Sequence, residues 1–276
     1  MSWRSLGAVL PTQLPAARLE LHFAAQLVSA PGKSLLAPEA DHAHTNLSWD
    51  SRLGVLAGRH VGGASLRAAL VFESLELAVL EGSLERASYR LAGSTLAQAL
   101  SWLSERVADD PNRLSLPTHD MPDHAIADGG SFGRAATEAR SELAAWFANA
   151  TASVQAVVSE DRRASIVRCW PHHFDVASLI TLDPGRDPEE ARSVGVGFSP
   201  GDRSYDQPYF YVTPWPYPSA DALPLLPAGM HWHTEGFTAA VLTAEQLISK
   251  PKSRQRAAVL DALGGALTAC RTLLRG

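Results

Sequence analysis

Apolar residues recur at helical spacing in four segments of this 276-residue chain. In each segment they return every three or four positions, which places them on one face of a helix. Ser94 or Thr95 is expected to cap the second helix, and Pro31 with Gly32 is expected to end the first. The pattern predicts helices over residues 16–29, 96–107, 137–160 and 254–274.

Short runs rich in aliphatic, β-branched and aromatic residues lie between these helices. Clusters of Gly, Pro, Asp or other charged residues separate them, as is typical of antiparallel strands. The runs Asp-Pro-Gly at 183–185 and Ser-Pro-Gly-Asp at 199–202 predict tight turns. The expected strands cover residues 53–56, 68–72, 75–80 and 88–91, and then 165–168, 174–182, 194–198, 209–213 and 231–242.

The order helix, strands, helix thus occurs twice, over residues 14–108 and 135–274. Because strands and helices do not alternate singly, the pattern predicts an α+β fold with antiparallel sheets flanked by helices. We expect one compact unit built from these two half-domains, and the repeated order raises the hypothesis that they are related. Residues 109–134 are rich in Pro, Gly and Asp and are expected to form a long connecting loop.

Composition limits the choice of partners and compartment. Hydrophobic residues make up 46% and charged residues 19% of the chain, as in ordinary globular proteins. The formal net charge is −5 and no basic run is present, which predicts no nucleic-acid and no membrane partner. Cys169 and Cys270 lie in unlike contexts, so we expect no disulfide and a cytoplasmic location.

The candidate metal ligands lie at the start of the last expected strand. Side chains alternate along a strand, so His231, His233 and Glu235 would share one face. Two histidines and one carboxylate form the ligand set of non-haem Fe(II) sites and of several hydrolytic zinc sites. The spacing therefore predicts a divalent metal, Fe or Zn, in an enzyme of hydrolase or oxygenase type that acts on a small molecule.

A second stretch, Trp-Pro-His-His-Phe-Asp at 170–175, is expected to form the opposite wall of the pocket. His173 and Asp175 are its candidate catalytic residues, because imidazole titrates near neutrality and a carboxylate can fix its tautomer. Aromatic residues near both stretches are typical of a small-molecule pocket. The candidate ligand-binding residues are Trp170, Tyr209, Tyr211, Trp215, Trp232 and, further away in the sequence, His44.

Two other interpretations use the same residues. Without a metal, they would bind a polar small molecule or act as acid and base. Alternatively, the protein is structural and its histidines are hydrogen-bonded core residues. No nucleophile elbow, P-loop or Rossmann fingerprint favours another chemistry.

Four runs, at 168–178, 195–202, 209–218 and 231–236, resemble those of an uncharacterised family of bacterial proteins. More distantly, the chain is similar to a broader domain family of unknown function. In that family a Phe-Asp-Leu-Ala strand corresponds to Phe174 and Asp175, and a His-Ala-Glu segment corresponds to His233 and Glu235, whereas His231 has no counterpart. The resemblance implies one fold over most of the chain and a site in its second half, and it brings no activity.

Overall fold

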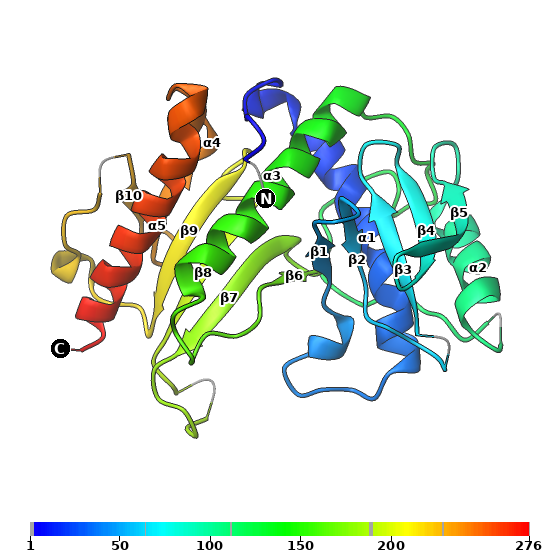
Figure 1. Cartoon of the computed structure of the whole chain (residues 1–276), viewed down its shortest axis with the longest axis horizontal. Coiled ribbons are helices and arrows are strands. Elements are labelled where there is room, and N and C mark those ends of the chain that lie inside the picture. The colour runs from blue at the N-terminus through cyan, green and yellow to red at the C-terminus, as the bar shows by residue number, and fades with distance from the viewer. Residues whose placement is uncertain (1–2, 64, 111, 188–189, 228, 276) are drawn as a thin grey trace. The chain divides into compact units, whose positions relative to one another are not determined.

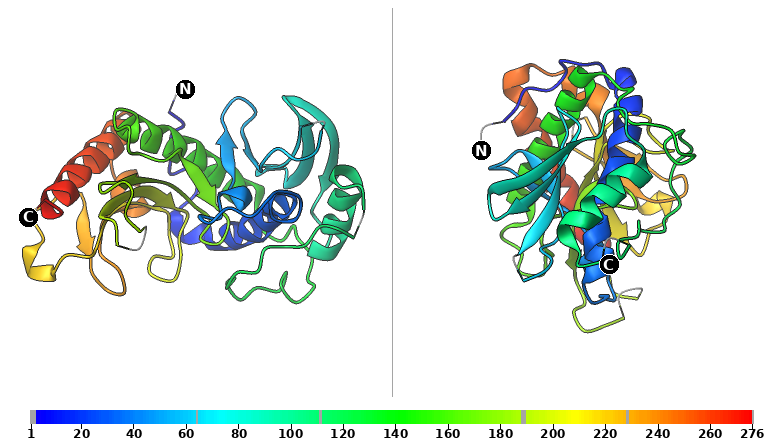
Figure 2. Two further views of the ribbon diagram at one scale, coloured as in Figure 1. Left: turned by 90° about the horizontal axis from the view of Figure 1, so that it is seen from below. Right: turned by 90° about the vertical axis from the view of Figure 1, so that its right-hand side faces the viewer.

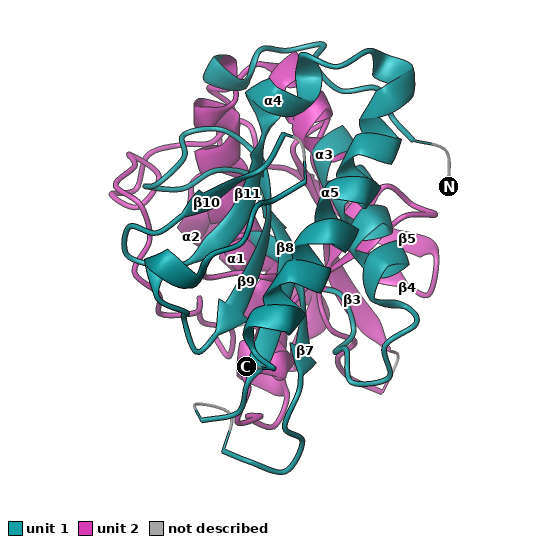
Figure 3. Ribbon diagram, turned by 90° about the vertical axis from the view of Figure 1, so that its left-hand side faces the viewer, with its two compact units in different colours: residues 1–12, 145–167, 175–276 teal, residues 13–144, 168–174 magenta. Residues whose placement is uncertain are grey.

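The computed structural model describes residues 3–63, 65–110, 112–187, 190–227 and 229–275 (Figure 1). Its helices and antiparallel sheets confirm the predicted α+β class. The chain divides into two compact units (Figure 3). Unit 1 comprises residues 1–12, 145–167 and 175–276, and unit 2 comprises residues 13–144 and 168–174. A relation between the two predicted halves stays a hypothesis.

Unit 2 is a meander sheet with two helices on one face (Figure 2). Each strand pairs antiparallel with the next one along the chain, as the sequence predicted. Leu56 and Leu70 pair directly and are fully buried. The strands are β1 (Ser48–Asp50), β2 (Val55–Ala57), β3 (Leu66–Val71), β4 (Glu76–Glu81) and β5 (Leu84–Arg90), and the helices are α1 (Pro15–Leu35) and α2 (Leu96–Val107).

Helix α1 continues past Pro31 and Gly32, so the prediction that these residues end it is wrong. Every residue from Leu21 to Gly32 is buried, and this packing offsets the backbone hydrogen bond that a proline removes. A Cβ at Gly32 would collide with the carbonyl oxygen of His44 in the short helix η2 (Ala43–Thr45). Glycine therefore allows η2 to approach the helix closely.

Capping boxes begin two of the helices. Thr95 accepts from the backbone of Gln98, which accepts in return from the backbone of Thr95, at 3.3 and 2.9 Å. The predicted cap is confirmed. Thr243 and Gln246 form the same arrangement at α4 (Ala244–Ile248), a short helix that the periodicity did not predict. Each cap contributes about 1 kcal/mol.

Unit 1 contains an antiparallel sheet with the strand order β10-β11-β9-β8-β7. Helix α3 (Thr137–Val158), which begins in unit 2, and α5 (Lys252–Leu273) pack on one face of it (Figure 1). Trp146 stacks on Phe198 at 5.8 Å between ring centroids, and Phe210 lies 5.3 Å from Phe198. The strands are β7 (Asp175–Thr181), β8 (Ser193–Ser199), β9 (Tyr209–Trp215), β10 (His231–His233) and β11 (Ala239–Thr243).

The single strand predicted over 231–242 is a hairpin, which corrects the expectation from the sequence. His231 pairs with Val241 and His233 pairs with Ala239, so β10 and β11 run antiparallel. Gly236 lies between them with φ +81°, a conformation that favours glycine. Glu235 consequently lies in the turn and is exposed, and it does not continue the strand face of His231 and His233.

The segment from β6 (Arg168–Trp170) to Phe174 belongs to unit 2. Leu47 and Cys169 exchange two backbone hydrogen bonds of 2.8 Å. Phe174 has φ +57° and donates its N–H to the carbonyl of Trp170 at 2.7 Å, which closes a tight turn over 171–174. Within 109–134 the described residues form turns and one bridge, between Phe132 and Ala92, without a helix or strand.

The short helices η1 (Pro11–Gln13) and η3 (Ala220–Ala222) complete the described elements. In the part of the chain that the structure describes, no helix combines the length and apolar character needed to cross a membrane.

Candidate functional site

Polar and aromatic side chains gather on the face of the unit 1 sheet opposite helices α3 and α5. Directly paired residues of antiparallel strands project to the same face. The pairing aligns His231 with Val241, Val241 with Tyr211, and Tyr211 with Gly197. We call this surface the tyrosine–histidine face; its polar residues are Asp175, Asp202, Tyr205, Tyr209, Tyr211, His231 and His233.

Tyr211 lies across strand β8 and reaches the first residue of β7. A Cβ at Gly197 would lie 2.8 Å from Cε1 of the Tyr211 ring, a separation that only glycine avoids. The Tyr211 hydroxyl donates to Oδ2 of Asp175 at 2.5 Å. Thr213 lies over Gly195 in the same way. The alternating glycines of β8 thus make room for side chains of the neighbouring strand.

Asp202 shapes the loop between β8 and β9. One carboxylate oxygen accepts from the backbone N–H groups of Ser204 and Tyr205, at 2.8 and 3.0 Å. The other accepts from the hydroxyl of Tyr209 at 2.5 Å. These contacts hold Tyr205 over the sheet, with its ring 4.9 Å from that of Tyr209.

The Tyr205 hydroxyl lies between the two histidines of β10. Its oxygen is 2.9 Å from Nε2 of His231 and 3.1 Å from Nδ1 of His233. The side-chain nitrogen of Gln246 lies 3.5 Å from Nδ1 of His231, and Nε2 of His233 lies 2.7 Å from the carbonyl oxygen of Glu235. All four ring nitrogens therefore have a partner among the described residues.

These partners assign a direction to the hydrogen bonds. The side-chain oxygen of Gln246 already accepts from the N-cap residue of α4, so its nitrogen donates to Nδ1 of His231. The Glu235 carbonyl only accepts, so Nε2 of His233 carries a proton. One arrangement satisfies every atom: Nε2–H of His231 donates to Tyr205, and the Tyr205 hydroxyl donates to Nδ1 of His233.

Burial keeps the three tyrosines and His231 of this face uncharged near pH 7. It raises the pKa of Tyr205, Tyr209 and Tyr211, and the carboxylates of Asp202 and Asp175 raise them further. Burial also lowers the pKa of His231, with a smaller contribution from neighbouring His233. The three phenols therefore stay protonated and His231 stays uncharged.

The predicted metal ligands do not form a coordination site with Glu235. Within the part of the chain that the structure describes, no group of three or more His, Cys, Asp or Glu side chains lies so as to hold a metal ion. A metal-ligating imidazole normally donates its second N–H to a carbonyl or carboxylate. His233 meets this condition through Glu235, whereas His231 faces the amide nitrogen of Gln246.

A second group of histidines belongs to unit 2. Nε2 of His22 on α1 donates to the carbonyl of Pro171 at 2.8 Å, and the ring stacks on Phe174 at 5.1 Å. The ring of His172 lies 4.1 Å from that of the candidate catalytic residue His173 and 5.5 Å from that of His119. We call His22, His119, His172 and His173 the histidine cluster.

Burial is the main influence on the pKa of three of these histidines, His22, His119 and His172. It lowers the pKa of His22 to about 4 and that of His172 to about 4. The pKa of His119 is lowered as well, first by burial and then by the charge of Lys33. His173 is exposed, and Trp170 contacts the cluster edge-on, 6.2 Å from His172.

Three further candidate residues, His44, Trp215 and Trp232, have other partners. His44 is buried in unit 2 and its Nδ1 accepts from the backbone of Glu39 at 3.1 Å. The exposed Trp215 packs edge-on against Tyr217. Trp232 donates from Nε1 to the carbonyl of Pro224 at 2.8 Å. The structure thus groups Asp175, Tyr209, Tyr211, His231 and His233 on one face.

The sequence did not single out Tyr205, Asp202, Gln246 or His22 as site residues. The turn predicted at 199–202 was the available signal for two of them, because Asp in a turn often accepts from the backbone two or three residues later. Tyr205 lies three residues after Asp202, where that contact places it.

No protein-family model, no curated protein and no solved structure matches this chain. The resemblance to an uncharacterised bacterial family stays a prediction from the motifs.

Proposed function

We propose that the protein binds a small polar molecule at the tyrosine–histidine face without a resident metal. The observation that carries the proposal is the directed hydrogen-bond chain through His231, Tyr205 and His233. Its rings are half-buried, so their polar edges reach solvent while their positions are fixed. Aromatic surfaces with a few oriented polar groups are typical of ligand sites.

The donor and acceptor roles in this series of hydrogen bonds favour a metal-free site. A metal on Nε2 of His231 would require the proton to move to Nδ1, where it would meet the N–H of Gln246. Two donors would then face each other, which costs about 1–3 kcal/mol when neither finds an acceptor. The metal-free arrangement avoids this cost and leaves every ring nitrogen of His231 and His233 with a partner.

A thermal-shift panel of sugars, polyols, amino acids and nucleosides tests the proposal with a matched pair of variants. Tyr205→Phe removes the central hydroxyl, and Tyr217→Phe removes a hydroxyl from an exposed residue outside the face. We expect a compound that stabilises the wild type and whose affinity falls about tenfold in Tyr205→Phe but not in Tyr217→Phe. Equal losses in both variants, or no stabilising compound, would contradict the proposal.

A metal-dependent enzyme, the function first predicted from the sequence, is the second candidate. It is favoured by the convergence of Nε2 of His231 and Nδ1 of His233 on one oxygen, at 2.9 and 3.1 Å. Two ligand atoms that bind one metal ion at about 2.1 Å, with an angle of about 90° between the bonds, lie about 3 Å from each other. The Tyr205 oxygen lies at about this distance from each of the two nitrogens. In this version Tyr205 replaces Glu235 as the third ligand, and Fe or Zn activates a small substrate.

Metal analysis separates the two candidates. After purification from metal-replete medium, we expect less than about 0.1 Fe or Zn per chain. One metal per chain that is lost in His233→Ala and Tyr205→Phe would instead establish the second candidate. The cytoplasmic location remains part of both proposals and rests on the cysteine pattern.

A further inference from the structure

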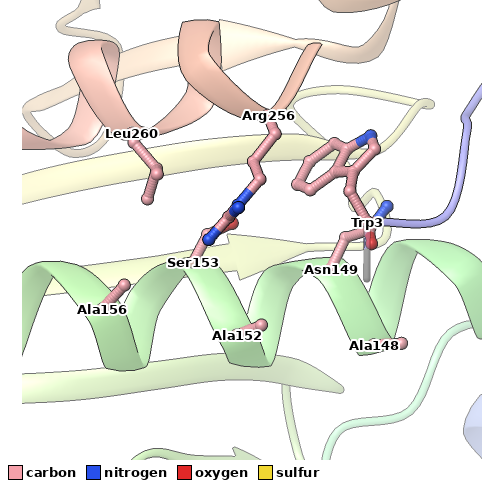
Figure 4. Close-up of a pocket in the computed structure, with 8 residues that line it drawn as sticks. All are labelled: Trp3, Ala148, Asn149, Ala152, Ser153, Ala156, Arg256 and Leu260. Carbon is pink, nitrogen blue, oxygen red and sulfur yellow. The ribbon is translucent and has the colours of Figure 1, made fainter. Parts of the chain in front are cut away.

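Unit 1 contains a pocket of about 180 Å³ between helices α3 and α5. It lies on the helical side of the sheet, opposite the tyrosine–histidine face. Figure 4 shows the guanidinium of Arg256 extending from α5 toward Ser153 on α3, with the indole of Trp3 at one end. The apolar lining comes from Trp3, Ala148, Ala152, Ala156 and Leu260, and the polar lining from Asn149, Ser153 and Arg256.

The wall that carries Trp3 is fixed by two buried side-chain amides. Asn149 accepts from the N–H of Arg4 at 3.0 Å and donates to its carbonyl at 2.7 Å. Gln255 accepts from the N–H of Leu6 at 3.0 Å and donates to its carbonyl at 3.1 Å. Each side-chain amide thus pairs with both the N–H and the carbonyl of one backbone residue, as a neighbouring strand would. These bonds hold the N-terminal segment against both helices.

Two polar side chains of the pocket, Ser153 and Arg256, form no hydrogen bond within the described residues. Ser153 is 3% exposed, and its hydroxyl makes no hydrogen bond with any residue that the structure describes. Arg256 likewise has no ion pair or hydrogen bond within the described ranges. A serine hydroxyl that lines a pocket without a protein partner can donate to a ligand oxygen, a hydrogen bond worth about 0.5–1.5 kcal/mol.

The surrounding charge favours an anion. The first turns of α5 carry Lys252, Arg254 and Arg256 and no acidic residue. This end of a helix also has the positive end of its dipole, so the potential beside Arg256 is positive. A guanidinium pairs with a carboxylate through two parallel hydrogen bonds, and a serine hydroxyl donates a third.

We propose that this pocket binds a small monocarboxylate with a flat apolar body. Its carboxylate pairs with Arg256 and accepts from Ser153, while its body packs on Ala152, Leu260 and the indole of Trp3. The volume equals that of about six water molecules in the liquid, which admits a compound of benzoate size and excludes drug-sized ligands.

Titration with benzoate and benzamide tests this site, since the two probes share a shape and differ in charge. Calorimetry is combined with backbone amide NMR shifts, and thermal melts confirm that each variant folds. We expect saturable benzoate binding that weakens about tenfold in Arg256→Gln and about threefold or more in Ser153→Ala. Arg254→Gln, on the same helix but outside the pocket, is expected to leave the affinity within twofold.

Benzamide is expected to bind at least about tenfold more weakly than benzoate. Three outcomes would each overturn the proposal. Benzamide could bind as tightly as benzoate, or Arg254→Gln and Arg256→Gln could lose affinity equally. The third is wild-type protein that does not saturate at about 50 mM benzoate, a concentration above which binding is too weak to indicate a specific site. Shifts confined to Ser153, Leu260 and their neighbours would support it. The outcome is independent of the tyrosine–histidine face, whose residues the three variants leave intact.

Discussion

The two groups of histidines differ in what holds their rings in place. On the tyrosine–histidine face, His231 and His233 have a defined partner for every ring nitrogen, with the Tyr205 hydroxyl between them. In the histidine cluster, the rings of His172 and His119 pack against other rings, and His22 bonds one carbonyl. Hydrogen bonds orient the first group, where burial also lowers the pKa of His231, whereas in the second group burial is the main cause that lowers the pKa of His22, His119 and His172.

The two groups therefore respond to different perturbations. Arg18, Lys33 and other histidines are the charged neighbours that lower the pKa of His22, His119 and His172, so acid adds positive charges that burial penalises. The structure of the tyrosine–histidine face depends on its hydroxyl groups and on the packing of Tyr211 over Gly197 of strand β8. Acid is therefore the sharper test of the histidine cluster, and removal of single atoms is the sharper test of the tyrosine–histidine face.

Acid is expected to give the largest effect, through His22. Its pKa in the folded protein is about 4 and lies below the ordinary 6.5, so the unfolded chain binds more protons between these values. The contribution to stability is complete above pH 6.5 and is lost as the pH falls toward 4. This one residue gives a slope of up to about 1.4 kcal/mol per pH unit. Urea unfolding at several pH values measures it.

His22→Gln is expected to reduce that slope, because glutamine does not titrate. His60→Gln is the matched control, since His60 is an exposed histidine of the same unit. If both variants keep the full slope, burial of His22 does not determine the acid sensitivity.

An alanine at position 197 is expected to give the next largest effect. Its Cβ would press on the Tyr211 ring, which must move and weaken its bond to Asp175, so we expect a loss of about 1–3 kcal/mol in the free energy of unfolding. Gly264 on α5 has open space around it, and Gly264→Ala should stabilise by about 0.5–1 kcal/mol. Chemical denaturation compares the two; effects of the same sign would refute the packing of Tyr211 over β8.

Tyr205→Phe is expected to give the smallest effect, a loss of about 1 kcal/mol, because the ring stays and only the shared hydroxyl is removed. Tyr217→Phe, which changes an exposed hydroxyl, should cost less than about 0.5 kcal/mol. A difference between the variants that is indistinguishable from zero would mean that the Tyr205 bonds contribute nothing.

The elements were largely predictable, because helical stripes and capping residues are local signals. Thr95 was found from its side chain type and from the stripe that follows it. Helix α1 passed through Pro31 because tertiary burial outweighed a local signal, and no local pattern reports such packing. The hairpin at 231–243 was missed because apolar residues on both arms imitate one strand.

The candidate site was predictable in place but not in detail. His231 and His233 were identified because alternation along a strand fixes which residues share a face, and Tyr211 because aromatic residues gather near the two stretches. Glu235 left that face when Gly236 turned the chain. Tyr205 was not identified, because its position depends on the carboxylate of Asp202 in a loop, and such contacts have no periodicity.

The tautomers of His231 and His233 distinguish the metal-free site from a metal site. Long-range ¹H–¹⁵N correlation spectra at pH 7.5 report which ring nitrogen carries the proton. The directed chain predicts a proton on Nε2 and none on Nδ1 in both rings, unchanged by a metal chelator. A proton on Nδ1 of His231, or imidazole signals that change when a chelator removes bound metal, would contradict the metal-free site.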